Sequence, residues 1–175
     1  MKQGRKRPTL SLKKALLKSS SARSMETDDS LSNEPDKYIV EITPRLYIAN
    51  HNTVKDAELL EQKEVQVVVN LISHKCYNLY PDKFLYEDYQ LADNPKEDLL
   101  KVIENVVLSI QRHLNDGKTV VVHCSKGISR APATAIAYLM KIECMSFDAA
   151  FDLVKSKSER IDPNAGFLMQ LNCLI

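Results

Sequence analysis

Short apolar runs alternate with longer helix-like patterns along most of this chain. Runs rich in β-branched residues predict five strands, over 39–42, 45–48, 65–71, 84–90 and 119–123. The run over 65–71 contains few polar residues, which is typical of a strand that is buried on both faces of a sheet. The pattern therefore predicts a sheet with a buried centre.

Apolar residues at helical spacing predict five helices between and after these strands. The helices are expected over 54–62, from Asn94 to Asn115, over 131–142, after a cap at Ser146, and from Asp162 and Pro163 onward. Asn94 can cap its helix with its side chain, and Pro95 suits the first turn because its missing amide has no partner there. Strands mixed with helices on this scale predict the α/β class, in which helices cover a central sheet.

The net charge of +1 hides an uneven distribution along the chain. Residues 1–23 carry eight Lys or Arg and no acid, so sixteen basic and twenty-three acidic side chains remain for the rest. We expect residues 1–36 to form a disordered basic and Ser-rich tail, and residues 37–175 to form one folded domain. Because the folded part is acidic, the composition argues against binding to nucleic acid.

The four cysteines, Cys76, Cys124, Cys144 and Cys173, have none of the paired spacing that is typical of zinc sites. The chain has no apolar secretory segment at its start and no run long enough to span a bilayer. We therefore expect a soluble cytoplasmic or nuclear protein with no metal, cofactor or disulfide framework. The acid-poor start also leaves a mitochondrial targeting segment open.

The residues around Cys124 predict a phosphate-binding loop. An apolar strand ends at this cysteine, and a loop of Ser125, Lys126, Gly127, Ile128 and Ser129 leads to Arg130 at a helix start. Loop amides and the helix N-terminus can surround an anion, and the planar Arg130 guanidinium can hold two phosphate oxygens at once. The same surroundings favour a thiolate, which can attack phosphorus and form a cysteinyl-phosphate. The competing interpretation is a buried structural cysteine followed by a surface arginine.

This motif resembles the dual-specificity protein phosphatases, which are cysteine-dependent tyrosine phosphatases. Further landmarks of the resemblance lie over 42–48, 67–71 and 162–171, in the same order along the chain. The resemblance implies a central mixed sheet flanked by helices, with the Cys-x5-Arg loop as the phosphate site. It also implies hydrolysis of phosphotyrosine and of phosphoserine or phosphothreonine on proteins.

The resemblance assigns the general acid to Asp93, between the strand over 84–90 and the helix that follows. A carboxylic acid there can protonate the leaving oxygen and later act as a base on the hydrolytic water. Asp88 and Asp98 are the competing carboxylates, and the alternative role of Asp93 is to stabilise a turn through local hydrogen bonds.

Three further residues have expected supporting roles, of which the resemblance implies the one for Asn70. Asn70 is expected to brace the phosphate loop, with an ordinary strand terminus as the alternative. His123 is expected to hold the loop and tune the thiolate rather than to transfer a proton, and the alternative is a satisfied core histidine. Lys126 either adds positive potential at the rim of the site or is a solvated lysine.

One position departs from the family pattern. Ala131 stands where the family usually has Ser or Thr, whose hydroxyl helps the sulfur to leave in the second step. Ser129 comes too early in the chain to inherit this role, so slow breakdown of the intermediate is expected. A phosphopeptide-binding pseudophosphatase without turnover therefore stays open as an alternative function.

Two other phosphatase activities fit the loop and the charge less well. Phosphoinositide phosphatases tend to carry two lysines in the loop, whereas here only Lys126 is basic, and the acidic domain disfavours an RNA 5′-triphosphatase.

The expected partners are phosphorylated proteins, and the tail suggests one class of them. Its basic residues Arg5 to Arg7, followed by Leu10 and Leu12, are similar to docking peptides that bind mitogen-activated protein kinases. A nuclear-localisation patch or a solvated arm are the alternatives.

Overall fold

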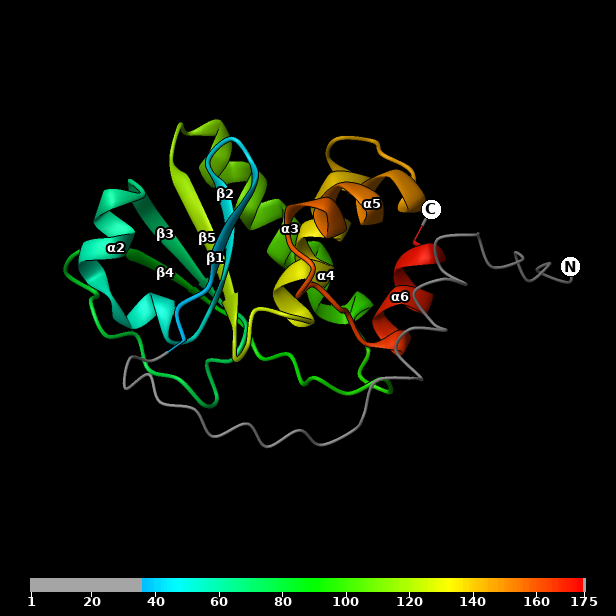
Figure 1. Ribbon diagram of the computed structural model, residues 1–175, viewed down its shortest axis with the longest axis horizontal. Helices are drawn as coiled ribbons and strands as arrows, with labels where there is room; N and C mark the ends of the chain where they lie inside the picture. Colours follow the sequence, from blue (N-terminus) through cyan, green and yellow to red (C-terminus); the bar gives the residue numbers. More distant parts are fainter. Residues whose placement is uncertain (1–35, 175) are drawn as a thin grey trace, which may run out of the picture.

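The computed structural model describes residues 36–174, which contain a five-stranded sheet with helices on both faces (Figure 1). The strands are β1 (Ile39–Thr43), β2 (Leu46–Asn50), β3 (Val65–Asn70), β4 (Leu85–Asp88) and β5 (Thr119–Cys124). Their order across the sheet is β1-β2-β5-β3-β4; the β1–β2 pair is antiparallel and the other pairs are parallel. The predicted α/β class with a central mixed sheet is therefore confirmed.

The helices lie in two layers (Figure 1). On one face are η1 (Thr53–Lys55) and α2 (Ala57–Gln62); on the other are α3 (Leu100–Asn115), α4 (Arg130–Lys141), α5 (Phe147–Lys157) and α6 (Ala165–Asn172). Side chains alternate between the faces of a strand, so each face of the sheet has its own core. Val121 packs in the core with Leu60 of α2, whereas Val120 and Val122 pack in the core that the larger helical layer covers.

β5 lies at the centre of the sheet, and all six of its residues are buried. Its parallel register places Asn50 of β2 opposite Cys124 and Asn70 of β3 opposite His123. The carboxyl ends of three neighbouring strands therefore meet at one edge of the sheet, which is where open α/β sheets place their ligand sites.

The helix predicted over 54–62 is interrupted at Asp56. This residue has an extended backbone (φ −101°, ψ 92°), and its side chain accepts a hydrogen bond from the amide of Leu59 at 3.0 Å. Aspartate is a preferred N-cap because its carboxylate satisfies a free amide of the first turn. The chain therefore forms the short helix η1 and then starts α2 afresh at Ala57.

The helix start predicted at Asn94 is wrong, because α3 begins at Leu100. The side-chain oxygen of Asn94 accepts from the amide of Lys96 at 2.9 Å, and its carbonyl accepts from Glu97 at 2.9 Å. These bonds close a turn, which is the alternative use of an asparagine that precedes a proline.

Two other predicted boundaries need correction, and one is confirmed. β4 ends at Asp88, short of the predicted end at residue 90. The last helix begins at Ala165 and is capped by Asn164, rather than starting at Asp162. The cap predicted at Ser146 is confirmed, since its side chain accepts from the amide of Ala149.

The tail predicted over 1–36 lies outside the described residues, apart from Asp36. The Arg160 guanidinium donates to both oxygens of the Asp36 carboxylate, at 3.1 and 2.7 Å. The tail therefore joins the described residues beside the segment between α5 and α6. Within residues 36–174, none of the helices combines the length and the apolar character that a membrane crossing requires.

Candidate active site

β5 delivers Cys124 to the carboxyl edge of the sheet. The strand TVVVHC starts with four β-branched residues and is buried on both faces, which fixes the position of its last residue. Cys124 is 1% exposed, and α4 begins only six positions later at Arg130. The predicted strand, loop and helix order is thus present, and the cysteine lies at the base of the loop.

Two segments hold the loop between Cys124 and Arg130 from outside. The amide of His51 donates to the carbonyl of Ser125 at 3.1 Å, and the amide of Asp162 donates to the carbonyl of Ile128 at 2.9 Å. A trans peptide is planar with its N–H opposite its C=O, so the amides that follow these two carbonyls point away from the outer segments. The amides of Lys126 and Ser129 are therefore turned away from the outer segments, which leaves them available to an anion held by the loop.

Gly127 allows the loop to pack closely on β2 and on the chain before β1. Its φ is +71°, and a Cβ at this position would lie 2.7 Å from Cδ1 of Tyr38 and 3.1 Å from the backbone of Ala49. A side chain would therefore be strained by the backbone conformation and would also clash. The loop's tight curl depends on this glycine.

Arg130 is 5% exposed and is held in place by two hydrogen bonds. One terminal nitrogen donates to the carbonyl of Leu91 at 3.2 Å, and the other donates to the hydroxyl of Ser125 at 3.0 Å. The remaining Nε donor is buried and has no hydrogen-bond partner among residues 36–174. An unpaired buried donor of a charged group is costly, and a bound phosphate oxygen could accept from it.

Asp93 lies against the same loop. Its Oδ1 accepts from the hydroxyl of Ser129 at 2.7 Å and from the side-chain amide of Asn164 at 3.0 Å, and its Oδ2 lies 3.8 Å from Nε of Arg130. The Asp93 side chain is 40% exposed, so it is within reach of a ligand. The structure therefore brings Cys124, Arg130 and Asp93 together.

The competing carboxylates are engaged elsewhere. Asp88 accepts from the side-chain amide of Asn78 at 2.8 Å, and Asp98 lies 3.6 Å from the ammonium of Lys101 one helical turn away. Neither carboxylate lines the cavity at Cys124. Among the three candidates, Asp93 alone combines a place in this cavity with a contact to the loop.

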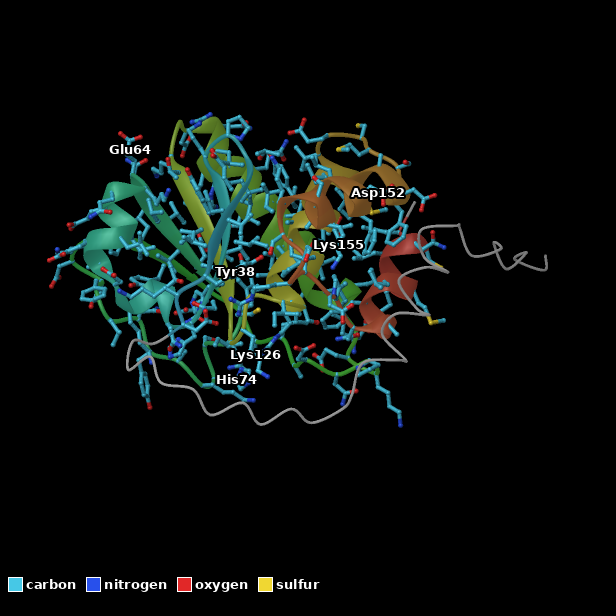
Figure 2. All side chains as sticks on the ribbon, in the orientation of Figure 1. Tyr38, Glu64, His74, Lys126, Asp152 and Lys155 are labelled. Carbon is cyan, nitrogen blue, oxygen red and sulfur yellow. The ribbon has the colours of Figure 1, made fainter. Side chains whose placement is uncertain are left out.

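The cavity at Cys124 has a volume of about 470 Å³. Its walls come from the phosphate loop, the segment after β4 and the start of α6; they are Asp93, Pro95, Cys124, Lys126, Ile128, Ser129, Asp162, Pro163, Asn164 and Ala165. Lys126 projects from the loop at the end of β5 (Figure 2). The cavity thus contains the nucleophile predicted from the sequence, the predicted acid Asp93, a second aspartate at position 162 and Lys126 at the rim.

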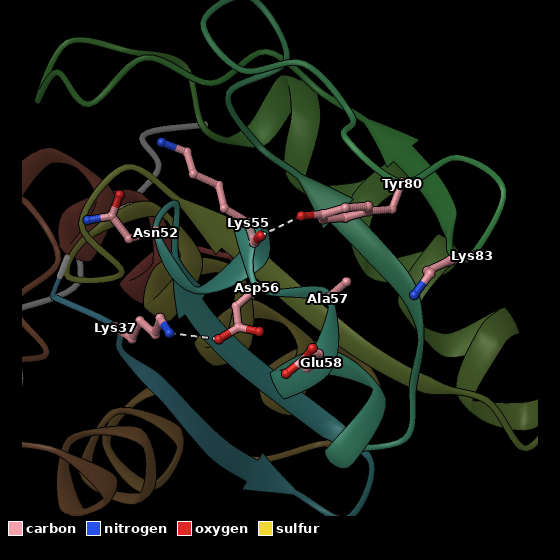
Figure 3. A pocket seen from close by; sticks show the side chains of 8 residues that line it. All are labelled: Lys37, Asn52, Lys55, Asp56, Ala57, Glu58, Tyr80 and Lys83. Atoms are coloured by element: carbon pink, nitrogen blue, oxygen red, sulfur yellow. Dashed lines mark hydrogen bonds and ion pairs between the residues drawn. The ribbon is translucent and has the colours of Figure 1, made fainter. Parts of the chain in front are cut away.

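Another cavity, of about 520 Å³, lies over η1 and the start of α2 (Figure 3). Three lysines line it, but Lys37 pairs with Asp56 at 2.7 Å and Lys83 pairs with Glu61 at 2.7 Å. The hydroxyl of Tyr80 donates to the carbonyl of Lys55 at 2.6 Å. Among the described residues that line it there is no cysteine or histidine, so we assign the chemistry to the smaller cavity at Cys124.

His123 is 1% exposed, and its environment keeps the ring neutral. Burial is the main cause that lowers its pKa from 6.5 to about 3, and the neighbouring His51 lowers it further. The two rings stack with their centroids 6.2 Å apart. Nδ1 of His123 is buried without a hydrogen-bond partner among the described residues. His123 is therefore a neutral support behind the loop and is not placed to donate a proton at neutral pH.

The contacts of Asn70 differ from the expectation that it braces the phosphate loop. Its side-chain amide donates to the carbonyl of Cys76 and to Asn78, both at 3.1 Å, and its oxygen accepts from the amide of Ile72 at 3.0 Å. These bonds organise the segment that follows β3. Asn70 supports the carboxyl edge of the sheet through this segment. An asparagine at the end of an apolar run is compatible both with bracing the phosphate loop and with an ordinary strand terminus, so the sequence pattern does not choose between them.

Two groups of residues beside the site had no role in the sequence-based prediction. Asn164 contacts Asp93, and His51 contacts both the loop and the thiol of Cys76, which lies 2.9 Å from Nδ1 of His51. His51 and Cys76 lie in loops that no local pattern connects, so their contact cannot be predicted from the sequence pattern. Asn164 had a signal, since an asparagine before a helical run is a cap candidate.

Within the part of the chain that the structure describes, no group of three or more His, Cys, Asp or Glu side chains could hold a metal ion.

Comparison with known families agrees with this geometry. Residues 46–174 match the family described as "Dual specificity phosphatase, catalytic domain". A dual specificity protein phosphatase of Drosophila melanogaster, MPK-4, is 36% identical over 135 residues, which cover 76% of this chain and 35% of that protein. The chain thus spans about a third of the length of this relative.

Solved structures give the same result for the fold. A mouse putative dual specificity phosphatase, complexed with zinc tungstate, has a TM-score of 0.72 at 29% identity and covers 86% of this chain and 91% of its own. The human tyrosine phosphatase-like serine/threonine/tyrosine-interacting protein has a TM-score of 0.72 at 28% identity, with 78% and 94% covered. Sequence and structural comparisons therefore indicate one family.

The pKa of His123 predicts how stability depends on pH. Between 6.5 and about 3, the unfolded chain binds this proton more readily than the folded one, so stability falls as pH falls through that window. Wild type should lose up to about 1.4 kcal/mol of unfolding free energy per pH unit relative to His123→Asn. Urea unfolding at pH 7 and pH 5 measures this, with exposed His74→Asn as the control. Equal pH slopes for wild type and His123→Asn would contradict the assignment.

Proposed function

The chain belongs to the dual-specificity phosphatase family, and we propose that it hydrolyses phosphotyrosine and phosphoserine or phosphothreonine on proteins through a cysteinyl-phosphate. The observation that carries the proposal is the meeting of Cys124, Arg130 and Asp93 at one cavity. These residues supply the three parts that such a reaction needs: a nucleophile, a cationic holder for the phosphate and a proton donor. The chain spans about a third of the length of the Drosophila relative, so the activity is a proposal for this chain and is not carried over from that whole protein.

In the first step, the Cys124 thiolate attacks phosphorus and the bond from phosphorus to the substrate oxygen breaks. Arg130 and the inward loop amides hold the non-bridging oxygens, and the free Nε donor of Arg130 gains a partner. Asp93 gives its proton to the leaving oxygen, so that an alcohol or a phenol departs rather than its anion. The products of this step are the dephosphorylated side chain and phosphorylated Cys124.

In the second step, water attacks the phosphorus of the cysteinyl-phosphate and the bond to sulfur breaks. Asp93, now a carboxylate, takes the proton of the water, and inorganic phosphate leaves with the thiolate restored. Ala131 is fully buried and offers no hydroxyl to the sulfur, while the Ser129 hydroxyl is bonded to Asp93. The departing sulfur therefore depends on the loop amides and the helix N-terminus, which supports a slow second step.

The charges of the cavity favour a singly phosphorylated protein side chain over a phosphoinositide. Among residues 36–174, Lys126 is the single lysine of the wall, and Asp93 and Asp162 line the same cavity. A ligand with several phosphates would bring further negative charge against these acids. The carboxylic acid beside the phosphate loop also supports turnover over a binding-only pseudophosphatase, which needs no proton donor.

We predict that Cys124→Ser lowers the hydrolysis of an aryl phosphate by at least about a thousandfold, because the hydroxyl is a poor nucleophile in this setting. Binding of a phosphotyrosine peptide should survive the change. Steady-state kinetics and peptide titration measure the two properties, and Cys144→Ser, at an exposed cysteine, is the matched control. Normal turnover in Cys124→Ser would contradict the mechanism. Peptide binding by a wild type that shows no turnover would instead support a binding module.

We predict that Asp93→Asn slows the hydrolysis of alkyl phosphates by about 10²- to 10⁴-fold. The hydrolysis rate of activated aryl phosphates should change little, because good leaving groups need less protonation. Rates across a series of leaving groups measure this selectivity. Asp98→Asn is the matched control, because Asp98 pairs with Lys101 outside the cavity. Equal slowing of all esters by Asp93→Asn would reject this residue as the general acid.

For partners, we propose phosphorylated proteins, with mitogen-activated protein kinases among them. Support comes from the basic residues Arg5 to Arg7 followed by Leu10 and Leu12, a pattern that lies outside the described residues. A docking tail would raise the local concentration of a bound substrate near Cys124. We also propose a cytoplasmic or nuclear location, with the same basic tail as the targeting signal. A mitochondrial location is the alternative.

We predict that removal of residues 1–23 lowers the rate on a doubly phosphorylated mitogen-activated protein kinase by about tenfold or more. The rate on a small aryl phosphate should stay the same, since the described site lies within residues 36–174. Parallel assays of both chains with both substrates measure this, and a fluorescent fusion of each chain reports its location. Equal rates on the kinase would leave the tail without a docking role.

A further inference from the structure

Helix α6 contacts the segment that carries Asp93 at three points along its length. We call residues 93–99 the acid loop; it connects the end of the sheet to α3. The contacts come from Asn164, Gly166 and Gln170, which lie within the 162–171 landmark but have no assigned role in the reaction. The rest of α6 is anchored by the buried side chains of Phe167, Leu168 and Leu171.

The side chain of Asn164 bonds both to helix α6 and to Asp93. Its oxygen accepts from the amide of Phe167 at 3.0 Å and caps α6, while its nitrogen donates to Oδ1 of Asp93 at 3.0 Å. Its main-chain amide donates to the Ser129 hydroxyl at 3.1 Å, and that hydroxyl donates to the same Oδ1 at 2.7 Å. Since Oδ1 already accepts two hydrogen bonds, the transferable proton of Asp93 belongs on Oδ2.

Gly166 sets the distance between α6 and the acid loop. A Cβ at this position would overlap the carbonyl oxygen of Pro95 and would lie 2.5 Å from its carbonyl carbon and 2.6 Å from its Cα. Backbone atoms cannot move aside as a flexible side chain can, so any larger residue would push the loop away. The glycine is required here for close approach rather than for its backbone conformation.

Gln170 fixes the far end of the acid loop. Its oxygen accepts from the amide of Leu99 at 2.9 Å, and its nitrogen donates to the carbonyl of Glu97 at 2.8 Å. Leu99 immediately precedes α3 and makes no side-chain cap of its own. One side-chain amide therefore satisfies two backbone groups at the start of α3 and ties them to α6.

We propose that Asn164, Gly166 and Gln170 are positioning residues that hold Asp93 where its Oδ2 can protonate the leaving oxygen. This role rests on the proposed function of Asp93 as the general acid. Asn164 and Ser129 fix the orientation of the carboxyl group, Gly166 sets the approach of the backbone, and Gln170 anchors the end of the loop. A proton donor must lie within hydrogen-bond reach of the leaving oxygen, so a shift of the loop by about 1 Å would affect proton transfer more than phosphate binding.

Asn164→Ser tests this role without removing the helix cap. Serine can still accept from the amide of Phe167, but it has no amide to donate to Asp93. We expect kcat for an alkyl phosphate to fall about tenfold and kcat for an activated aryl phosphate to change less than about threefold. In the pH profile of kcat for the alkyl phosphate, the limb that reports the protonated acid should shift or flatten. Ser146→Ala, which removes the cap of α5 only, should leave both rates unchanged.

A double-mutant cycle separates a catalytic role from a loss of folding. In an Asp93→Asn background, Asn164→Ser should add no further preference for good leaving groups, because the proton donor is already absent. Gly166→Ala and Gln170→Ala should reproduce the leaving-group selectivity of Asn164→Ser, and thermal unfolding identifies any variant that fails to fold. The exposed α6 residue Met169, changed to Ala, is the control on the same helix.

Two outcomes would overturn the role, and they are distinguishable. If Asp93→Asn shows leaving-group selectivity but Asn164→Ser slows all esters equally, α6 has only a structural role while the proposed function stands. If Asp93→Asn itself shows no selectivity, Asp93 is not the acid, and the positioning role fails together with that part of the proposed function.

Discussion

Parallel pairing of β5 between β2 and β3 is the constraint on which the site depends. All six residues of β5 are buried, so its register is fixed by apolar packing on both faces. That register aligns Asn50 with Cys124 and Asn70 with His123, which places the loop at the carboxyl edge of three strands. A slip of one residue would turn the side chains of β5 to the opposite faces and remove the thiol from the base of the loop.

The electrostatics of the site follow from what is buried around this loop. His123 is kept neutral by burial, with a pKa of about 3, so the buried charge beside Cys124 comes from Arg130. Two N–H groups of Arg130 are bonded to Leu91 and Ser125, and its buried Nε, which has no hydrogen-bond partner among residues 36–174, can still donate to a ligand. Asp93 reaches the same arginine at 3.8 Å. Acid and cation are thus both preassembled, which lowers the reorganisation that the reaction requires.

The sequence predicted what is local, and it missed what depends on contacts between distant segments. Cys124, the loop and Arg130 are contiguous, so one pattern of strand, loop and helix was enough to place them. The helix start at Asn94 was wrong because an asparagine before a proline can close a turn as well as cap a helix, and the contacts with α6 select the turn. The role of Asn164 was missed for the same reason, since its partner Asp93 lies 71 positions away in the chain.

The central claim is that Cys124 becomes phosphorylated during turnover, and trapping that intermediate tests it most directly. The full chain would be mixed with an aryl phosphate, quenched in acid on the millisecond scale, digested and mapped by mass spectrometry. The mechanism predicts one phosphoryl group on the peptide that contains Cys124, formed at the rate of the initial burst and absent from Cys124→Ser. Turnover with the phosphoryl group on another residue, or with none on any peptide, would contradict it.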